Sequence, residues 1–400
     1  MKLTESILLW KDEMAQVRRD IHAHPELAYE EHRTADRVAA LLTEWGIPVH
    51  RGLGKTGVVG TIKGTADNGK SIGLRADMDA LPMQEANQFA HASKHPGIMH
   101  ACGHDGHTAM LLTAARYLAQ HRDFAGTIYV IFQPAEEGHS GAKAMIDDGL
   151  FSLFPMDAVF GMHNWPGMPV GQFGVKAGAM MASSNTFVID IEGKGAHGGM
   201  PHLGVDPVMA AVQLAQSLQT IITRNRNPLD PAVLSITQIH TGSADNVVPN
   251  DATLRGTVRT FTHETLDLIE ERMRAMATLT AEAMGCSARV DFERKYPPTI
   301  NDEAAAQFCT QVLEDIVGTD NIVQPVEPSM GAEDFAFMLH EKPGCYVWIG
   351  NGQGDHRTPG HGMGPCMLHN NSYDFNDDLI PLGATYWIEL ARRWLSQYAQ

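Results

Sequence analysis

SIGLRAD (71–77), a short apolar run that ends in an aspartate, is the stretch that decides the fold. Two runs of the same kind follow it, TIYVIFQ (127–133) and DAVFGMH (157–163), and helical patterns such as residues 107–120 lie between them. Strands that alternate with helices along a chain indicate an α/β sheet with helices on its faces. The first part of the chain, up to about residue 183, therefore predicts an α/β domain.

The segment 184–295 has a different order of elements, β-α-β-β-α-β, which is that of a ferredoxin-like α+β domain. One predicted helix begins after the N-cap Asp206 with Pro207 in its first turn, and the second helix ends at Gly285. The four strands are expected at FVIDIEG (187–193), VLSITQI (233–239), TLRGTVRTF (253–261) and SARVDFE (287–293).

The α/β pattern resumes near residue 296 with a predicted helix at 302–317, a strand CYVWIG (345–350) and a closing amphipathic helix at 379–397. We therefore expect one discontinuous α/β domain, residues 1–183 and 296–400, interrupted by an inserted lid domain at 184–295.

Composition excludes several classes of function. The net charge of −17, without a Lys/Arg cluster, disfavours binding to nucleic acid and to anionic lipid. No apolar run approaches the roughly 20 residues that span a bilayer. The five cysteines are too few and too scattered for a disulfide framework. We expect a soluble, cytoplasmic protein with reduced thiols.

The segment HACGHDGHT (100–108) gathers candidate metal ligands ahead of a predicted helix. Cys102 and His104 are one residue apart and can face the same metal ion, which would deprotonate the thiol. A nucleophilic cysteine–histidine pair is the alternative, because a low-pKa thiolate beside an imidazole is also the centre of cysteine hydrolases and acyltransferases. A non-enzymatic metal-storing or partner-binding protein is a third possibility, against which the acidic residues of the next cluster argue.

Glu136 and Glu137 stand side by side directly after an apolar strand. Two adjacent carboxylates there repel each other unless a cation compensates. One of them can bind a metal ion while the other acts as general base toward a water molecule whose pKa the metal lowers. The alternative is a solvated acidic turn.

Further candidates follow other strands. His163 ends the run at 157–163, and His369 lies in MLHNNSYDFND near the end of the sequence. Asp77 and Asp79 stand two apart at a strand end, where they can orient ligands, bind metal or simply form a turn. Because ligands bind beyond the carboxyl ends of strands in open α/β sheets, these segments are expected to gather at one edge.

At this point the sequence resembles the metallo-aminoacylase and carboxypeptidase family, and within it the branch of hippurate hydrolases, N-acyl-amino-acid amidohydrolases and auxin-conjugate hydrolases. The matching stretches run along the whole chain: RRDIHAHPEL (18–27), RADMDALPM (75–83), MHACGHDGHTAML (99–111), PAEEG (134–138), GMHNWP (161–166), GKGAHGGMPH (193–202), NVVPN (246–250), MGAEDF (330–335) and LHNNSYDFND (368–377).

The resemblance implies a mixed-sheet, zinc-peptidase-like catalytic domain with two divalent metal ions per subunit and an inserted ferredoxin-like dimerisation domain. Residue by residue, it implies Glu136 as general base. Zinc or manganese is expected, with cobalt or nickel also accepted by such donors. The implied metal ligands are Cys102, His104, Glu137, His163 and His369.

In the inserted domain, the resemblance implies that His197 reaches the site of a neighbouring subunit and stabilises the oxyanion, and that Asn246 and Arg259 bind substrate. Arg259 can instead pair with an acid, and His197 can cap a Gly-rich turn. The implied activity is hydrolysis of N-acyl amino acids to a carboxylic acid and an amino acid, in a homodimer or a dimer-based tetramer. A dipeptidase or carboxypeptidase acting on small peptides is the alternative, and the sequence leaves the acyl group open.

Overall fold

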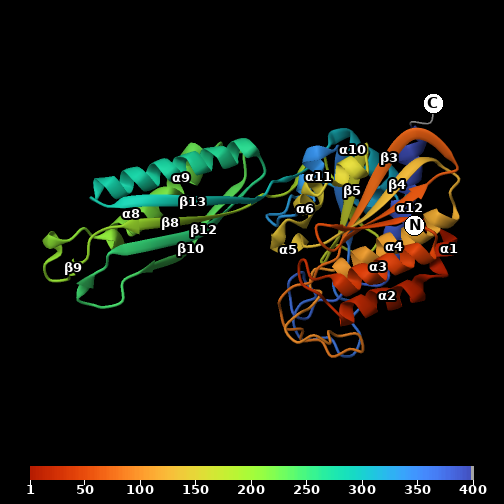
Figure 1. Ribbon diagram of the computed structural model, residues 1–400, viewed down its shortest axis with the longest axis horizontal. Coiled ribbons are helices and arrows are strands. Elements are labelled where there is room, and N and C mark those ends of the chain that lie inside the picture. The colour runs from red at the N-terminus through yellow and green to blue at the C-terminus, as the bar shows by residue number, and fades with distance from the viewer. Residues whose placement is uncertain (398–400) are drawn as a thin grey trace. The chain divides into compact units, whose positions relative to one another are not determined.

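The computed structural model describes residues 1–397 of the chain, which forms two compact units (Figure 1). Unit 1 comprises Met1–Met180, Ile300–Glu327 and the residues from Asp334 onward. Unit 2 comprises Met181–Thr299 and Pro328–Glu333. Among the described residues, no helix combines the length and the apolar composition that crossing a membrane requires.

An eight-stranded mixed sheet forms the centre of unit 1. Its middle strands β4, β3, β5 and β16 run parallel, so their carboxyl ends share one edge. β5 and β16 are buried along almost their whole length, as the apolar runs of the sequence require. The strands in sheet order are β1 (Val49–Leu53), β2 (Gly57–Lys63), β4 (Ala125–Gln133), β3 (Ala66–Asp77), β5 (Ala158–Trp165), β16 (Gly344–Gly350), β6 (Phe173–Gly174) and β15 (Ile322–Val323).

Helices cover this sheet and complete the core. α4 and α12 pack against each other and against β3, α2 packs on α4, and α10 packs on β16. The helices of unit 1 are α1 (Glu5–Leu8), α2 (Lys11–Ala23), α3 (His32–Glu44), α4 (His104–Gln120), α5 (Glu136–His139), α6 (Gly141–Asp147), α7 (Leu150–Leu153), α10 (Glu303–Val317), α11 (Ala336–Glu341) and α12 (Leu379–Gln397).

Unit 2 is a four-stranded antiparallel sheet in the order β10-β12-β8-β13, with α8 and α9 packed on it. This is the strand order of a ferredoxin-like domain. Asp206 caps α8 by accepting from the backbone N–H of Val208 at 2.8 Å, as its place before Pro207 predicted. The elements are β8 (Ser184–Glu192), α8 (Pro207–Thr220), β10 (Ala232–Thr241), β12 (Asp251–Thr260), α9 (His263–Ala283) and β13 (Ser287–Tyr296).

The mixed α/β fold with an α+β insertion is confirmed, and every strand and helix expected by residue range is present within a few residues. The extent of the insertion is wider than 184–295. The short segment Pro328–Glu333 belongs to unit 2, because the carbonyl groups of Ser329 and Gly331 accept the backbone N–H of Ala182 at 3.0 Å. That pairing joins residues distant in sequence and has no local pattern.

Candidate metal centre

The candidate ligands meet at the carboxyl edge of the unit 1 sheet. Asp77 ends β3, and Glu136 and Glu137 follow β4 after two residues. His163 lies two residues before the end of β5, and His369 belongs to the long segment after β16. Parallel strands bring all of these side chains except His369 to the same edge, as expected for open α/β sheets.

The start of α4 orients Cys102 and His104. Gly103, the N-cap residue, has φ +93°, and a Cβ on it would lie 2.2 Å from Nδ2 of Asn164. Only glycine fits this left-handed position and this close approach. Asn164 fills the space and donates to the carbonyl oxygen of Cys102 at 2.6 Å. The turn thereby fixes the two candidate ligands on either side of Gly103.

The Glu136–Glu137 pair sits on a strained turn. Ala135 has φ 55°, a left-handed conformation that is costly for a residue with a Cβ. The buried carboxylate of Glu31 holds this turn in place: its Oε1 accepts the Ala135 N–H at 2.8 Å, and its Oε2 accepts the Thr56 hydroxyl. Glu136 is 6% exposed, so the turn places a carboxylate in a nearly closed site.

His163 presents one nitrogen to the site. Its Nδ1 donates to the carbonyl of Asn164 at 2.6 Å, which leaves Nε2 3.4 Å from Sγ of Cys102. Burial lowers the pKa of His163 well below its usual range. A neutral imidazole whose second nitrogen is fixed by a hydrogen bond is the form that binds a metal ion.

Glu137 links the remaining two candidates. Its Oε1 lies 3.9 Å from Nε2 of His104 and 3.3 Å from Nε2 of His369. His369 has φ 58°, and its backbone N–H donates to the carbonyl of Ala101 at 2.7 Å, which ties the segment after β16 to the Cys102 turn. The side chain of His369 is 55% exposed, so it forms the solvent side of the cluster.

These residues fit a metal centre. Nε2 of His104 and Oε1 of Glu137 are buried and have no hydrogen-bond partner among the described residues. Buried polar atoms without a partner are costly, and a cation at their meeting point would satisfy both. The groups whose donor atoms lie within 4.8 Å of one another include Cys102, His104 and His163; Cys102, Glu137 and His369; and His104, Glu136 and Glu137.

Asp77 and Asp79 contact histidine side chains in and beside the candidate ligand cluster. Asp79 accepts from Nδ1 of His104 at 3.2 Å and from the backbone N–H of Glu137 at 2.9 Å. Asp77 contacts Nδ1 of His107 at 2.6 Å. Carboxylates in such positions fix the orientation of histidine ligands and raise their basicity. Asp77 also forms a potential donor group of its own with His104 and His107.

Electrostatics favour a bound cation over a reactive thiolate. Burial lowers the pKa of His104, but the carboxylates of Asp77 and Asp79 outweigh it and raise that pKa to about 10. Burial, followed by the charges of Glu137 and Glu136, raises the pKa of the Cys102 thiol well above its usual value. A nucleophilic cysteine requires the opposite shift. The surroundings of Cys102 therefore disfavour the cysteine-hydrolase alternative.

A buried polar network beneath the site was not predicted. The guanidinium of Arg75 donates to Asp77 at 2.6 Å, to Gln133 at 2.8 Å and to Asp334 at 3.1 Å. Asp334 also accepts the backbone N–H of Ala142 at 2.9 Å. A charged residue in the apolar run SIGLRAD is the one sequence feature that indicates such a network, since a buried charge requires partners.

In unit 2, two of the three expected substrate-binding residues lie together. His197 on β9 (Ala196–His197) and Asn246 line one pocket of about 700 Å³, where β9 pairs with β11 (Val247–Val248). Arg259 is not among the lining residues. It stands near the other end of β12, eight residues from Asp251 or roughly 26 Å of extended strand, and donates to the Thr257 hydroxyl at 2.8 Å.

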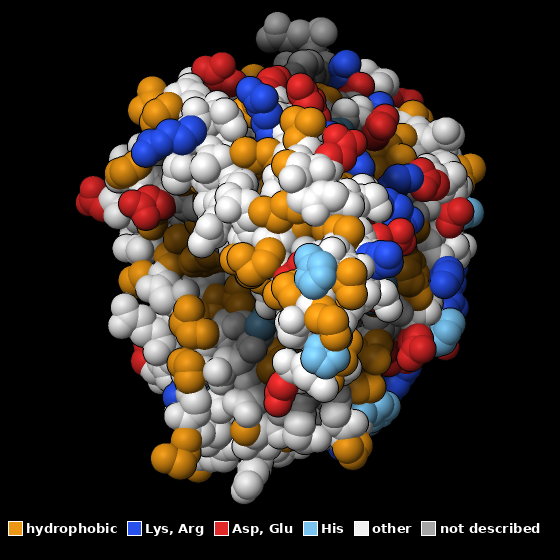
Figure 2. Space-filling view, turned by 90° about the vertical axis from the view of Figure 1, so that its left-hand side faces the viewer, with side chains coloured by type: hydrophobic (Ala, Val, Ile, Leu, Met, Phe, Trp, Pro, Cys, Tyr) orange, Lys and Arg blue, Asp and Glu red, His pale blue; other side chains and the backbone are white. Residues whose placement is uncertain are grey.

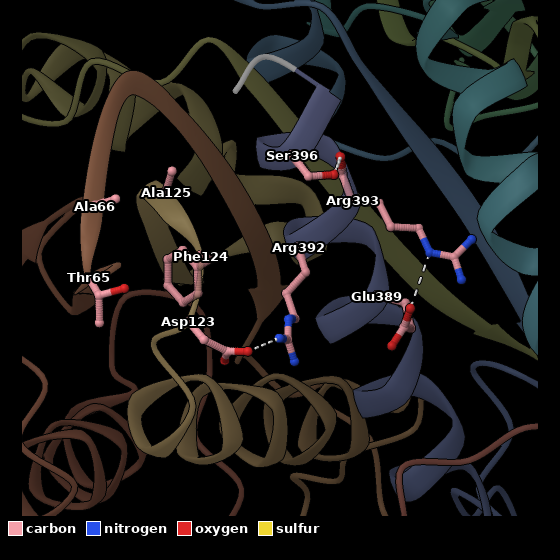
Figure 3. A pocket seen from close by; sticks show the side chains of 9 residues that line it. All are labelled: Thr65, Ala66, Asp123, Phe124, Ala125, Glu389, Arg392, Arg393 and Ser396. Carbon is pink, nitrogen blue, oxygen red and sulfur yellow. Dashed lines mark hydrogen bonds and ion pairs between the residues drawn. The ribbon is translucent and has the colours of Figure 1, made fainter. Parts of the chain in front are cut away.

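A further pocket of about 670 Å³ lies between the start of β4 and the end of α12 (Figure 3). An ion pair between Arg392 and Asp123 crosses it, and Glu389 pairs with Arg393 beside it. Its lining contains neither histidine nor cysteine, and it includes none of the predicted site residues. This pocket therefore has no part in the candidate metal chemistry.

A mixed α/β sheet with Cys, His and Glu donors beyond its carboxyl ends is the arrangement of a metal-dependent hydrolase. The chain belongs to the peptidase family M20/M25/M40, whose family model matches residues 73–393. It is 42% identical over 396 residues to a hippurate hydrolase of Campylobacter jejuni, covering 99% of this chain and 100% of that protein.

Two Bacillus subtilis proteins are also similar. The chain is 42% identical over 382 residues to an N-acetyl-L-cysteine deacetylase, covering 95% of this chain and 87% of that protein. The crystal structure of the YXEP protein, described as a dinuclear metal binding peptidase from the M20 family, superposes with a TM-score of 0.83 at 35% identity, covering 97% of this chain and 99% of that one.

Proposed function

We propose that the protein is a metal-dependent amidohydrolase that cleaves N-acyl amino acids to a carboxylic acid and a free amino acid. The observation that carries this proposal is the meeting of Nε2 of His104 and Oε1 of Glu137 beside Cys102 and Glu136, both atoms being buried and without a hydrogen-bond partner among the described residues. The similarity to a hippurate hydrolase and to an N-acetyl-L-cysteine deacetylase supports the substrate class.

Two divalent metal ions are proposed, held by Cys102, His104, Glu137, His163 and His369. When bound, divalent ions polarise the amide carbonyl and make the attacking water more acidic. The mixture of thiolate, imidazole and carboxylate donors supports zinc, and manganese is the second choice. The 35% identical dinuclear relative supports the count of two.

Glu136 is proposed as the group that moves the proton. Its carboxylate takes a proton from water as the oxygen attacks the amide carbon, which produces a tetrahedral oxyanion. It then gives that proton to the nitrogen of the leaving amino acid as the C–N bond breaks. Its 6% exposure supports this role, since proton transfer is most effective where bulk water is excluded.

We propose that unit 2 forms a dimer, and that His197 and Asn246 act in the site of the neighbouring subunit by stabilising the oxyanion and binding substrate. The guanidinium of Arg259 is proposed to bind the substrate carboxylate through two parallel hydrogen bonds. Exposed apolar residues support an interface: Met209 and Val212 on α8 are 56% and 43% exposed, and Ile239 on the edge strand β10 is 48% exposed. Figure 2 shows hydrophobic side chains and His side chains on the face that it presents.

A reducing compartment such as the cytoplasm is proposed as the location. All five cysteines are free and buried. Two of them, Cys102 and Cys366, belong to segments rich in other metal-ligating residues. Thiols in such surroundings persist where the compartment keeps them reduced.

The deciding experiment measures release of amino acid from N-benzoylglycine, N-acetylmethionine and an unacylated dipeptide. The purified protein is assayed as isolated, after chelation, and after zinc or manganese is returned. We expect hydrolysis of the acylated substrates, loss on chelation and recovery with metal. Hydrolysis of the dipeptide alone would instead establish the peptidase alternative, and activity that a chelator leaves intact would overturn the metal mechanism.

A further inference from the structure

A second cluster of metal-ligating side chains lies in the segment between β16 and α12. Residues 351–378 of this segment contain neither helix nor strand. A stretch of this length without secondary structure is uncommon inside a compact domain, because its backbone lacks the hydrogen bonds that order helices and sheets. Turn hydrogen bonds and bonds to side chains, such as that from the Gly362 N–H to Oδ1 of Asn87, order this segment in place of helix or strand pairing.

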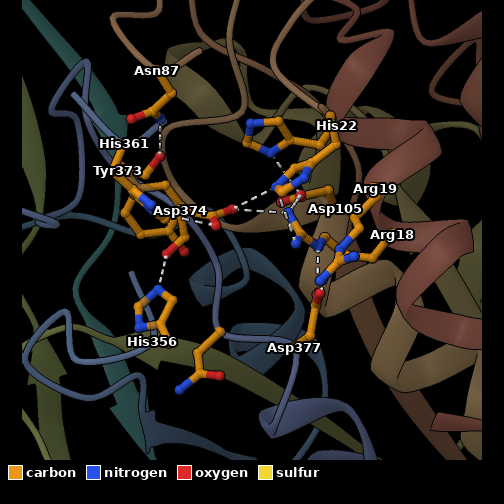
Figure 4. Close-up of polar contacts among 12 residues, drawn as sticks. Arg18, Arg19, His22, Asn87, Asp105, His356, His361, Tyr373, Asp374 and Asp377 are labelled. Atoms are coloured by element: carbon orange, nitrogen blue, oxygen red, sulfur yellow. Dashed lines mark hydrogen bonds and ion pairs between the residues drawn. The ribbon is translucent and has the colours of Figure 1, made fainter. Parts of the chain in front are cut away.

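Three donors from this segment converge, and Cys366 lies beside one of them. Nε2 of His361 lies 3.4 Å from Oδ2 of Asp374, and Sγ of Cys366 lies 3.8 Å from Nε2 of His356. His356 also reaches the backbone carbonyl of Asp374 at 3.1 Å. The donor atoms of His356, His361 and Asp374 all lie within 4.8 Å of one another. Figure 4 shows both histidines directed toward Asp374.

The cluster contains a buried polar atom without a hydrogen-bond partner. Nδ1 of His356 makes no hydrogen bond among the described residues, and the contact of Nε2 of His361 with Asp374 is a long ion pair of 3.4 Å. The side chain of His361 is 5% exposed, Cys366 is 7% exposed and Asp374 is 5% exposed. Two imidazoles, a thiol and a carboxylate brought together away from water carry the desolvation cost that a bound cation would offset.

Asp374 is oriented for such a role by residues outside the segment. Its Oδ1 accepts from the buried guanidinium of Arg18 at 3.0 Å and lies 3.4 Å from Nε2 of His91. These contacts occupy one carboxylate oxygen and leave Oδ2 directed at His361. Carboxylate ligands of metal ions are commonly fixed in this way by a hydrogen bond on the second oxygen.

We propose that His356, His361, Cys366 and Asp374 form a metal site distinct from the catalytic cluster, which takes one zinc ion and orders the segment 351–378. Four donors that include a thiolate and two imidazoles match a closed tetrahedral zinc site and disfavour magnesium or calcium. The spacing H-x4-H-x4-C-x7-D places all four ligands within nineteen residues of one segment. This site lies beyond the proposed function and does not depend on it.

The proposed second zinc site would also help to position His369. His369, a proposed catalytic ligand, lies between Cys366 and Asp374 in the sequence. Zinc at the second site would fix Cys366 and Asp374, which flank His369 in the sequence. It would thereby hold His369 against the Cys102 turn, where the N–H of His369 contacts Ala101. Loss of this zinc should therefore loosen His369 as well as the segment itself.

The test separates the two sites by disabling the catalytic one first. In the full-length variant C102S/H104A/H163A, loaded with zinc and dialysed, we expect one zinc ion per chain to remain by mass spectrometric metal analysis. Adding H356A/H361A should remove it. The matched control adds H32A/H50A, which deletes two exposed imidazoles of the same unit and should leave the zinc in place.

A spectroscopic arm guards against variants that fail to fold. In the C102S background, cobalt in place of zinc should show a thiolate-to-cobalt absorption from Cys366, and the nearly isosteric C366S change should abolish it. Absence of retained zinc in the disabled protein, or zinc and cobalt signals that persist after H356A/H361A and C366S, would overturn the proposal. Because metal content is measured without substrate, neither result depends on the proposed hydrolase activity.

Discussion

Asp79 contacts Glu137 through the backbone, accepting its N–H at 2.9 Å, and the same carboxylate holds Nδ1 of His104 at 3.2 Å. One side chain thus positions two proposed ligands that come from different elements of the fold. Asp79→Asn replaces one of these acceptor oxygens by a donor. We expect metal affinity to fall about 10- to 100-fold, the usual cost of losing such a support.

Metal titration followed by calorimetry checks the effect of Asp79→Asn. The exposed Asp67→Asn change, which removes a carboxylate remote from the candidate ligands, is the matched control. An affinity for zinc or manganese equal to that of the unaltered protein would show that Asp79 serves only the turn.

Substitutions of the two adjacent glutamates should differ in their effects on metal content and on kcat. Glu136→Gln is expected to lower kcat about 100- to 10,000-fold while leaving metal content intact, because it removes the proposed general base alone. Glu137→Gln is expected to lower metal content together with activity. Metal analysis and kcat measured on the same preparations check this. The assignment is reversed if Glu136→Gln loses the metal and Glu137→Gln keeps it.

Glu31 should act on the reaction through the turn at Ala135. Glu31→Ala leaves the N–H groups of Tyr29 and Ala135 and the hydroxyl of Thr56 without their acceptor. Each buried donor left without a partner costs about 1–3 kcal/mol. We expect a lower urea midpoint together with a lower kcat, and a milder loss of both in Glu31→Gln, which retains one acceptor oxygen.

KM and kcat measured separately decide whether Glu31 positions Glu136 or only stabilises the fold. A positioning role predicts that Glu31→Gln lowers kcat at a temperature where the variant is fully folded. If only the unfolding midpoint changes, Glu31 is a structural residue.

A pH dependence of stability follows from His22. Burial lowers the pKa of His22, but Asp105 and Glu85 outweigh it and raise the folded-state pKa from 6.5 to about 10. Its stabilising effect is therefore complete below pH 6.5 and declines as the pH rises toward 10, because the unfolded chain releases the proton first. The difference in thermal midpoint between the unaltered protein and His22→Gln should shrink over this range.

Thermal unfolding in buffers between pH 6.5 and 10 provides the measurement for His22. A difference in midpoint that stays constant across that range would mean that the imidazole contributes by packing and neutral hydrogen bonds alone.

The proposed exchange of His197 between subunits predicts complementation. Glu136→Gln and His197→Ala should each be nearly inactive as homodimers. A mixed dimer would contain one intact site, so random exchange of subunits should restore about a quarter of the full activity, since half the dimers are mixed and half their sites are intact. Mixtures that stay as inactive as their components would place His197 in the site of its own chain or outside catalysis.

Much of the fold follows from local pattern. Buried parallel strands read as apolar runs, and the polar residues that follow SIGLRAD, TIYVIFQ and DAVFGMH mark the edge where the strands end. The meeting of the candidate ligands was predictable for the same reason, because the topology of an α/β sheet brings those strand ends together whatever their distance in sequence.

The supporting residues were not predictable in this way. Arg18 meets Asp374 across 356 positions, and Glu31 meets Ala135 across 104. Such pairs of buried polar groups are specified by three-dimensional packing, and neither member carries a periodic or spacing pattern that names its partner. The same holds for Pro328–Glu333, which joins unit 2 through backbone hydrogen bonds that any sequence can make.

β16 lies inside the unit 1 sheet, between β5 and β6, although it is the last strand of the described chain. On the ribosome, the inserted segment up to Thr299 emerges well before Gly344–Gly350. Domains tend to fold as they are synthesised. The inserted domain should therefore be folded before β16 is available to pair with β5. For the proposed ligand set, metal acquisition is thus expected late in biogenesis, after the segment that bears His369 has left the exit tunnel.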